Sequence, residues 1–245
     1  MSNRVATLTD RREFEPRNRL LAVLPGEDLL SLRPHLEPVL LTRGVMLEAD
    51  EPLTRVYFVE TGVVSLVAVL ENRTSTGVSM VGREGLIDIA TLLGSDTALG
   101  RHSVHVPGSA LALEVRRFRS ALQASRKLRA ACQAYAQAFL FQALHAVACN
   151  RSHTVEQRCA RWLLTCADRI KNDTLQLTQE SLAGMLGVRR STVSVVAQRL
   201  RHAGLICYRG GAITVLDRPG LEAVACECYR ILRGRYERLL ARDVG

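Results

Sequence analysis

Thiols are the most reactive side chains in this sequence, which has seven cysteines: Cys132, Cys149, Cys159, Cys166, Cys207, Cys226 and Cys228. Those that lie near one another in sequence, such as Cys226 and Cys228, lack the C-x-x-C spacing typical of zinc ligands. We therefore predict no metal site and interpret the cysteines as buried, reduced thiols. Cys149 is the one we would test for a redox response.

Asp88, His102 and His105 are the residues that could be imagined as a catalytic cluster. Nothing around them forms a nucleophile elbow, a P-loop, a dinucleotide fingerprint or an H-E-x-x-H motif. We predict that the chain is not an enzyme.

The segment 177–202 has the pattern of two short helices joined by a tight turn at Gly187. The second helix has an apolar side made of Val193, Val196, Ala197 and Leu200. Its other side is polar and basic, and we assign to DNA contacts Arg189, Arg190, Ser191, Thr192, Ser194 and Arg199. This pattern predicts a helix-turn-helix whose second helix enters the major groove.

Two short strands follow, at 205–208 and 212–216, around a turn that holds Arg209, and they predict a wing that contacts phosphate. From Ser181 to Leu216 there are five arginines and no carboxylate, in a chain of formal charge +9. Because the arginine fork suits phosphates and guanine edges, this window favours double-stranded DNA as the partner.

The remainder of the chain divides into a flexible arm at 1–19, a strand-rich part at 20–126, a long helix at 127–151 and a C-terminal part at 152–245. We predict that the C-terminal part begins with a helix opened by a capping box of Thr154 and Gln157, and ends in a helix from 217 to about 240. Short apolar runs with turn residues about every ten positions predict a small antiparallel barrel or sandwich in the second part, with separate strands that include 56–59, 63–70, 104–106 and 110–115. The fold class is therefore α+β.

Residues on the long helix alternate in the steps of four and three of a heptad pattern: Leu128, Cys132, Tyr135, Phe139 and Gln142. This seam suits contact with a second copy of the chain, while the rest of the helix packs on its own domain. Its glutamines, and the absence of a visible signal peptide, argue against a membrane span and favour the cytoplasm.

The order of barrel, long helix and winged helix-turn-helix resembles the Crp/Fnr family of bacterial transcription regulators. The resemblance rests on 43–67, with Gly62 at a strand-joining glycine, on 81–94 in the place of a ligand-pocket segment, and on 177–206. It implies an N-terminal jelly-roll-like β-roll, a homodimer joined by the long helix, and sequence-specific DNA binding controlled by a signal in the β-roll. It also makes RNA polymerase a candidate partner.

The same comparison places the effector pocket at Gly85, Asp88, Arg101 and Ser103, but with changes. Where cyclic-AMP-binding members have a Gly-Glu pair, this chain has Ile87 and Asp88, and His102 follows Arg101 where a hydroxyl is expected. We predict that cyclic AMP is not the ligand.

Other cofactors of that family are also unexpected. No cysteine precedes Cys132, so no iron–sulfur cluster of the Fnr type is expected. His102 or His105 could serve as an axial haem ligand, although surface histidines are the simpler interpretation.

The target and the mode of action stay open at this stage. Ser191 and Val195 stand where the family often has a glutamate and an arginine, so an unfamiliar operator is expected. The alternatives are a ligand-binding module that acts through protein partners, and a constitutive DNA binder with a vestigial pocket. The effector and the sign of regulation also stay open.

Overall fold

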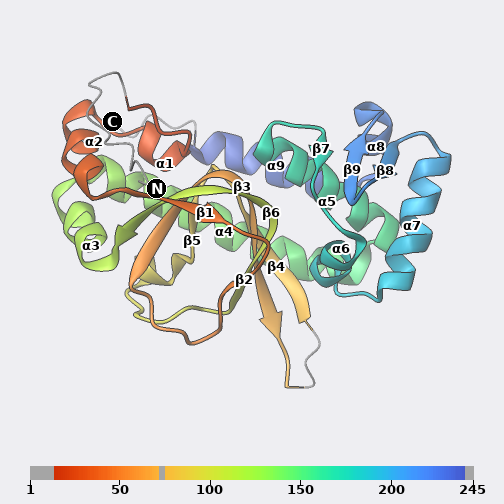
Figure 1. Ribbon diagram of the computed structural model, residues 1–245, viewed down its shortest axis with the longest axis horizontal. Coiled ribbons are helices and arrows are strands. Elements are labelled where there is room, and N and C mark those ends of the chain that lie inside the picture. Colours follow the sequence, from red (N-terminus) through yellow and green to blue (C-terminus); the bar gives the residue numbers. More distant parts are fainter. Residues whose placement is uncertain (1–13, 72–74, 241–245) are drawn as a thin grey trace, which may run out of the picture.

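The computed structural model describes residues 14–71 and 75–240, which form a strand-rich part and a helical part connected by a long helix (Figure 1). None of the helices in these two ranges is both long enough and apolar enough to cross a bilayer. The strand-rich part, the β-roll, contains β1 (Glu37–Leu41), β2 (Gly44–Leu47), β3 (Arg55–Val69), β4 (Ser75–Val81), β5 (Leu86–Ile87) and β6 (Arg101–Glu114).

The β-roll is built on β3 and β6, which pair antiparallel along most of their length, with β1 and β2 beside β6 and β4 and β5 beside β3. The sequence predicted separate strands at 56–59 and 63–70, but β3 is continuous. It continues because Gly62 takes a φ of +93°, and a side chain there would meet the Val106 carbonyl at 2.6 Å. Likewise, the runs predicted at 104–106 and 110–115 belong to one strand, β6.

Short helices cover the end of the β-roll: α1 (Arg19–Ala22), α2 (Gly26–Leu32), η1 (Arg33–His35), η2 (Ile89–Leu93) and α3 (Val115–Ala124). Of the arm predicted at 1–19, residues 1–13 lie outside the described residues, and the following ones are held in place. Asn18 is fully buried, caps α1, and donates from its amide to the carbonyls of Val59 and Gly85. The prediction of a loose arm is therefore wrong for residues 14–18.

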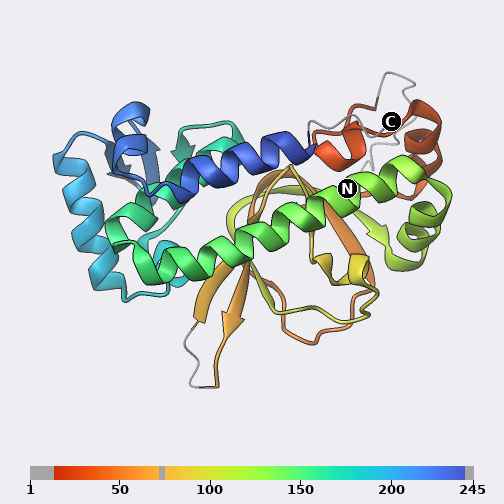
Figure 2. The same ribbon diagram turned by 180° about the vertical axis from the view of Figure 1, so that it is seen from behind.

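The long helix α4 (Arg126–Ser152) lies across the β-roll and extends beyond it (Figure 2). The heptad residues predicted to meet a second copy are at most 4% exposed: Leu128, Cys132, Tyr135, Phe139 and Gln142. Most of them belong to the same apolar core as the β-roll. The assignment of this seam to a partner is thus wrong, because the chain's own domain already covers it.

The opposite side of α4 is exposed and has its own heptad spacing, with Leu140, Leu144 and Val147 in steps of four and three. These three side chains are 59%, 62% and 73% exposed. The sequence correctly indicated a helix that is apolar on two sides. The side that it assigned to a partner packs on the chain's own core, and the other side is the one left exposed.

The helical part, here called the head, begins at a capping box formed by Thr154 and Gln157, as the sequence predicted. It contains α5 (Val155–Ile170), β7 (Thr174–Leu175), α6 (Gln179–Leu186), α7 (Arg190–His202), β8 (Ile206–Arg209), β9 (Ala212–Val215) and α8 (Arg218–Val224). Its apolar core includes Val63, Met80 and Val106 of the β-roll, so the two parts share packed surface.

The head also touches the β-roll at close range. Gly77 of β4 lies against Met185 and Trp162, where any side chain would come within 2.7 Å of the Met185 carbonyl. Arg43 donates a hydrogen bond of 2.6 Å to the Gln176 carbonyl. The head is therefore docked on the β4 side of the β-roll.

The last helix, α9 (Cys228–Leu240), is separate from α8, whereas the sequence predicted one helix from 217 to 240. It leaves the head and runs back along α4 toward the β-roll (Figure 2). Tyr236 is buried in the β-roll core and its hydroxyl donates to Gln142 on α4. The C-terminal part at 152–245 is thus a head at 155–224 followed by a helix that braces it.

Candidate nucleic-acid interface

Two helices and a tight turn form the helix-turn-helix expected from the sequence. Thr178 caps α6 through its hydroxyl, and Gly187 ends it in the left-handed region at φ +64°, ψ +37°. A glycine is suited to this turn because such a φ strains other residues. The chain then reverses and starts α7 at Arg190.

The inner side of α7 packs on the head core through the four residues that the sequence placed there: Val193, Val196, Ala197 and Leu200. Ser194 has a second role that the sequence did not reveal. Its hydroxyl donates to Gln179 Oε1 at 2.7 Å and to the Arg190 carbonyl at 3.1 Å. Ser194 therefore fixes α7 relative to α6.

The first turn of α7 is basic and exposed. Arg189 occupies the N-cap position, Arg190 and Ser191 follow, and all three are exposed. No acidic residue lies in this turn, and the unpaired N–H groups of a helix N-terminus favour anions. The end of the helix is thus suited to phosphate and to the acceptor edge of guanine.

The wing is the hairpin that follows α7 in the head. Strands β8 and β9 pair antiparallel, and Gly210 and Gly211 join them with φ values of +59° and +79°. Two successive residues of positive φ make the turn type that matches the twist of a hairpin. Arg209, the last residue of β8, is exposed at this turn.

The outer side of α7 is not covered by any other described element, and α7 stands at the end of the molecule opposite α3 (Figure 1). Arg199 is 67% exposed and lies 3.9 Å from Glu156 Oε2. An exposed pair at that distance holds its members weakly, so Arg199 can turn to a phosphate. Five of the predicted contact residues are thus exposed, Arg189, Arg190, Ser191, Arg199 and Arg209, whereas Thr192 and Ser194 are half-buried.

The β-roll does not bring the predicted effector residues together. His102 is fully buried and faces Asp88 at 3.9 Å, between its Nδ1 and Oδ2. Arg101 and Ser103 are the neighbours of His102 on β6, so they point to the other side of the sheet. Arg101 is paired there with Glu48 at 2.9 Å. Arg101 and Ser103 therefore do not share a side of β6 with the His102–Asp88 pair.

The acid that would bind ribose is occupied within the chain. Asp88 accepts hydrogen bonds from the backbone N–H groups of Ala90 and Leu99, at 2.7 and 3.0 Å. Burial lowers the pKa of His102, so its ring is neutral near pH 7 despite the carboxylate beside it. The interpretation of His102 and His105 as surface histidines is wrong, because both side chains are buried.

Gly85 is enclosed by α4. A side chain at this position would come within 2.0 Å of the Tyr135 ring, and the Tyr135 hydroxyl donates to the Leu86 carbonyl at 2.9 Å. The segment that resembles a ligand-pocket loop thus packs directly on the long helix. Tyr135 therefore joins this loop to α4.

Comparisons with known proteins agree with this architecture. Residues 157–224 match the family model of the Crp-like helix-turn-helix domain. No curated protein matches the chain significantly.

Among solved structures, FixK2 from Bradyrhizobium japonicum is similar, with a TM-score of 0.66 and 16% identity over 78% of this chain and 98% of that one. CLP of Xanthomonas campestris, a global regulator responsive to c-di-GMP, has a TM-score of 0.63 and 16% identity over 79% of this chain and 100% of that one. TTHA1359, a Crp/Fnr family regulator of Thermus thermophilus, has a TM-score of 0.62 and 23% identity over 77% and 98% of the two chains.

The chain has the same architecture as these regulators. Its β-roll comes first, and the long helix, the helix-turn-helix and the wing follow. The chain therefore carries a Crp-like helix-turn-helix domain at 157–224, and its fold is similar to those of regulators of the Crp/Fnr family.

Proposed function

We propose that this protein is a homodimeric transcription regulator that binds specific sites on double-stranded DNA. The observation that carries the proposal is the uncovered first turn of α7, where Arg189 and Arg190 are exposed with no carboxylate in that turn. Arg190 is the base-reading residue in this proposal, and Arg199 and Arg209 contact phosphates.

The exposed apolar seam of α4 supports the homodimer. Leu140, Leu144 and Val147 lie on one side of a long helix, with Gln133 and Gln137 continuing the same heptad positions. Packing this seam against its copy on a symmetry mate buries side chains that otherwise face water. Two heads related in this way read two half-sites of a two-fold related DNA sequence.

The arrangement of side chains in the β-roll supports the proposal that its ligand is not cyclic AMP, or that it has no ligand. A cyclic phosphate needs donors that converge on it, whereas Arg101 and Asp88 lie on opposite sides of β6. A protein that binds DNA constitutively, with the β-roll as a support for α4, fits the same observation.

Selection of bound sequences from a random DNA pool tests the main proposal. We expect recovery of a two-fold related site whose affinity falls steeply with salt, as phosphate neutralisation requires. The control for arginine substitutions at the DNA interface is Arg116→Ala, which removes one positive charge from α3, at the end of the molecule opposite α7. This variant should bind the site as the parent chain does. A pool that returns no enriched sequence contradicts the proposal and favours a module that acts through protein partners.

Calorimetry with cyclic AMP tests the proposal that this nucleotide is not the ligand. No heat of saturable binding is expected at micromolar nucleotide. Saturable binding with one site per chain would show that the interior rearranges to accept it.

A further inference from the structure

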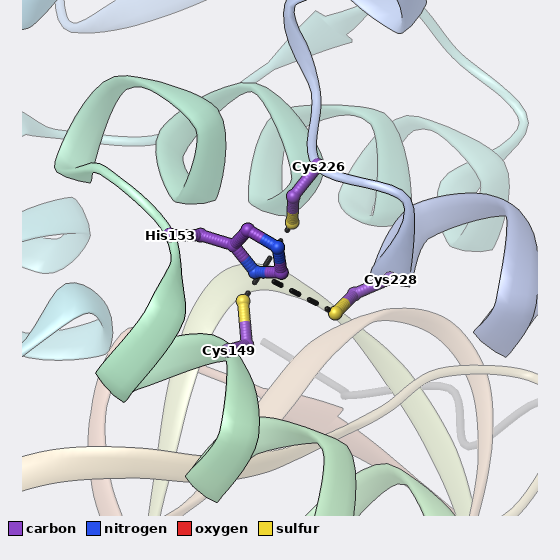
Figure 3. A group of neighbouring side chains, drawn as sticks. All are labelled: Cys149, His153, Cys226 and Cys228. Atoms are coloured by element: carbon purple, nitrogen blue, oxygen red, sulfur yellow. Dashed lines mark hydrogen bonds between the residues drawn. The ribbon is translucent and has the colours of Figure 1, made fainter.

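Four side chains with metal-binding atoms meet where the long helix ends. Cys149 lies in the last turn of α4, His153 follows that helix directly, and Cys226 and Cys228 lie at the connection from α8 to α9 (Figure 3). Their Sγ and ring nitrogen atoms all lie within 4.8 Å of one another. The three thiols are at most 4% exposed and form a cluster separate from the two main cores.

Two of the distances between these atoms are close to those around a single tetrahedral ion, and none of the others exceeds 4.8 Å. Zinc–sulfur bonds of about 2.3 Å and zinc–nitrogen bonds of about 2.05 Å at tetrahedral angles put two sulfurs about 3.8 Å apart and sulfur and nitrogen about 3.6 Å apart. Cys149 Sγ lies 3.6 Å from Cys226 Sγ, and Cys228 Sγ lies 3.8 Å from His153 Nδ1. Three thiolates and one imidazole are also a ligand set found in structural zinc sites.

The histidine has the support that zinc ligands usually have. While Nδ1 of His153 faces Cys228, its Nε2 lies 3.0 Å from Glu227 Oε2. A carboxylate that accepts from the second ring nitrogen fixes the orientation and tautomer of the ring and raises its basicity as a ligand. Glu227 thus occupies the place of the outer carboxylate in a carboxylate–histidine–zinc arrangement.

The positive charge near the four side chains favours a zinc ion bound by three thiolates. Zinc with three thiolates and a neutral imidazole has a net charge of −1, and the guanidinium groups of Arg158 and Arg161 interact electrostatically with the cluster. Both residues are buried, and the Nε atoms of both have no hydrogen-bond partner among the described residues. Arg158 also donates to the Asn150 side chain and to the Leu186 carbonyl, which connects this charge to the end of α6.

We propose that Cys149, His153, Cys226 and Cys228 bind one Zn²⁺ ion, which joins the end of α4 to the start of α9. Such a joint holds α9 in its course along α4 and so fixes the head on the β-roll. Its role is structural, because protein ligands fill all four positions and leave none for a substrate.

Other uses of the four residues fit less well. An iron–sulfur cluster places several iron and sulfide atoms between its ligands, which separates them further than around one ion. A disulfide between Cys149 and Cys226 needs its sulfurs about 2.05 Å apart, and it leaves Cys228, His153 and Glu227 without a role. Both are distinguishable by experiment.

Metal analysis of the full chain, purified under reducing conditions and exposed to Zn²⁺, tests the site. We expect one equivalent of zinc per chain, and Co²⁺ in its place should give the thiolate charge-transfer and d–d absorption of a tetrahedral Cys₃His site. Cys226→Ser and His153→Ala should each lose the tight equivalent. Cys207→Ser, which changes a thiol on β8 outside the cluster, is the matched control and should keep it.

Glu227→Gln provides a variant in which all four ligands remain. We expect the affinity for zinc, measured by competition with a chromophoric chelator, to fall about 10- to 100-fold. Three outcomes would each overturn the proposal. They are less than a tenth of an equivalent of zinc in the wild-type chain, a loss of zinc in Cys207→Ser equal to that in the ligand variants, and the visible absorption of an iron–sulfur cluster. The test does not depend on DNA binding, so failure of one proposal leaves the other standing.

Discussion

Arg169 of α5 and Glu84 of the β-roll form a buried ion pair, with Nε and Oε1 2.7 Å apart and both side chains less than 10% exposed. The same guanidinium donates to the Met80 carbonyl and to Gln142 of α4. One side chain of the head thus joins it to both the β-roll and the long helix.

Removing one member of this pair should loosen the docking of the head. Glu84→Gln leaves the Arg169 charge buried without its partner, and we expect a loss of about 3–5 kcal/mol in the free energy of unfolding. Urea denaturation monitored by the fluorescence of Trp162, the single tryptophan, measures it. Glu37→Gln, which breaks the exposed pair with Arg55, should cost less than about 1 kcal/mol. Equal effects of the two changes would contradict this interpretation.

Arg190 and Arg209 should affect DNA binding in different ways. Arg190→Ala should cost about 1–3 kcal/mol on the selected site and relax specificity at one base pair. Arg209→Ala should weaken binding to all sequences about equally and lower the salt slope by about 1. Fluorescence anisotropy against single-base variants of the site at several salt concentrations separates the two patterns. A uniform loss for Arg190→Ala would make it a phosphate contact.

Leu144→Glu should separate the dimer. Burial of a leucine side chain stabilises by about 1.5–3 kcal/mol, and the change is present twice, so the dimer should weaken by more than about 100-fold. Sedimentation velocity over a range of protein concentrations measures this directly. Leu40→Glu, at an 83% exposed leucine on β1, is the control. If only that control dissociates the protein, the seam on α4 is not the interface.

His105 should make the fold sensitive to mild acid. Its Nε2 lies 2.6 Å from the Ser65 hydroxyl, and burial, with the charge of Arg43, lowers its pKa from 6.5 to about 4. The unfolded chain therefore binds a proton between pH 6.5 and 4 that the folded chain does not bind, so stability falls as the pH is lowered through this window. The loss approaches about 3 kcal/mol at pH 4.

Comparison of His105→Gln with the parent chain isolates this contribution. Denaturation midpoints at pH 7, 5.5 and 4 should show a smaller acid loss in the variant, because glutamine does not titrate. His202→Gln, at an exposed histidine, should retain the full acid loss. Parallel pH curves for the parent and His105→Gln would refute the prediction.

Local patterns in the sequence were sufficient for the helix-turn-helix. The apolar side of α7, the glycine at 187 and the capping box at Thr154 are set by residues within a few positions of one another, and all appear in the structure. The strands of the β-roll were also found, although Gly62 joins two of them, because a bulge disturbs the apolar pattern without ending the strand.

Contacts between segments far apart in the sequence could not be predicted from such local patterns. The heptad seam of α4 was real, but periodicity does not tell which of two apolar sides meets the chain's own core and which meets a partner. The cluster of Cys149 and Cys226 was missed for a similar reason. Its two halves are 77 positions apart, and only the return of α9 along α4 brings them together.

The same return of α9 has a consequence for the DNA sites. Because α9 packs along α4 and its Tyr236 is buried in the β-roll core, we expect the head not to swing freely about residues 152–154 and its orientation to be set before DNA arrives. A preorganised pair of heads loses little entropy on binding, but it cannot adjust to half-sites that are moved apart. Insertion of a single base pair between the half-sites should therefore abolish specific binding, whereas a protein with flexibly attached heads would tolerate it.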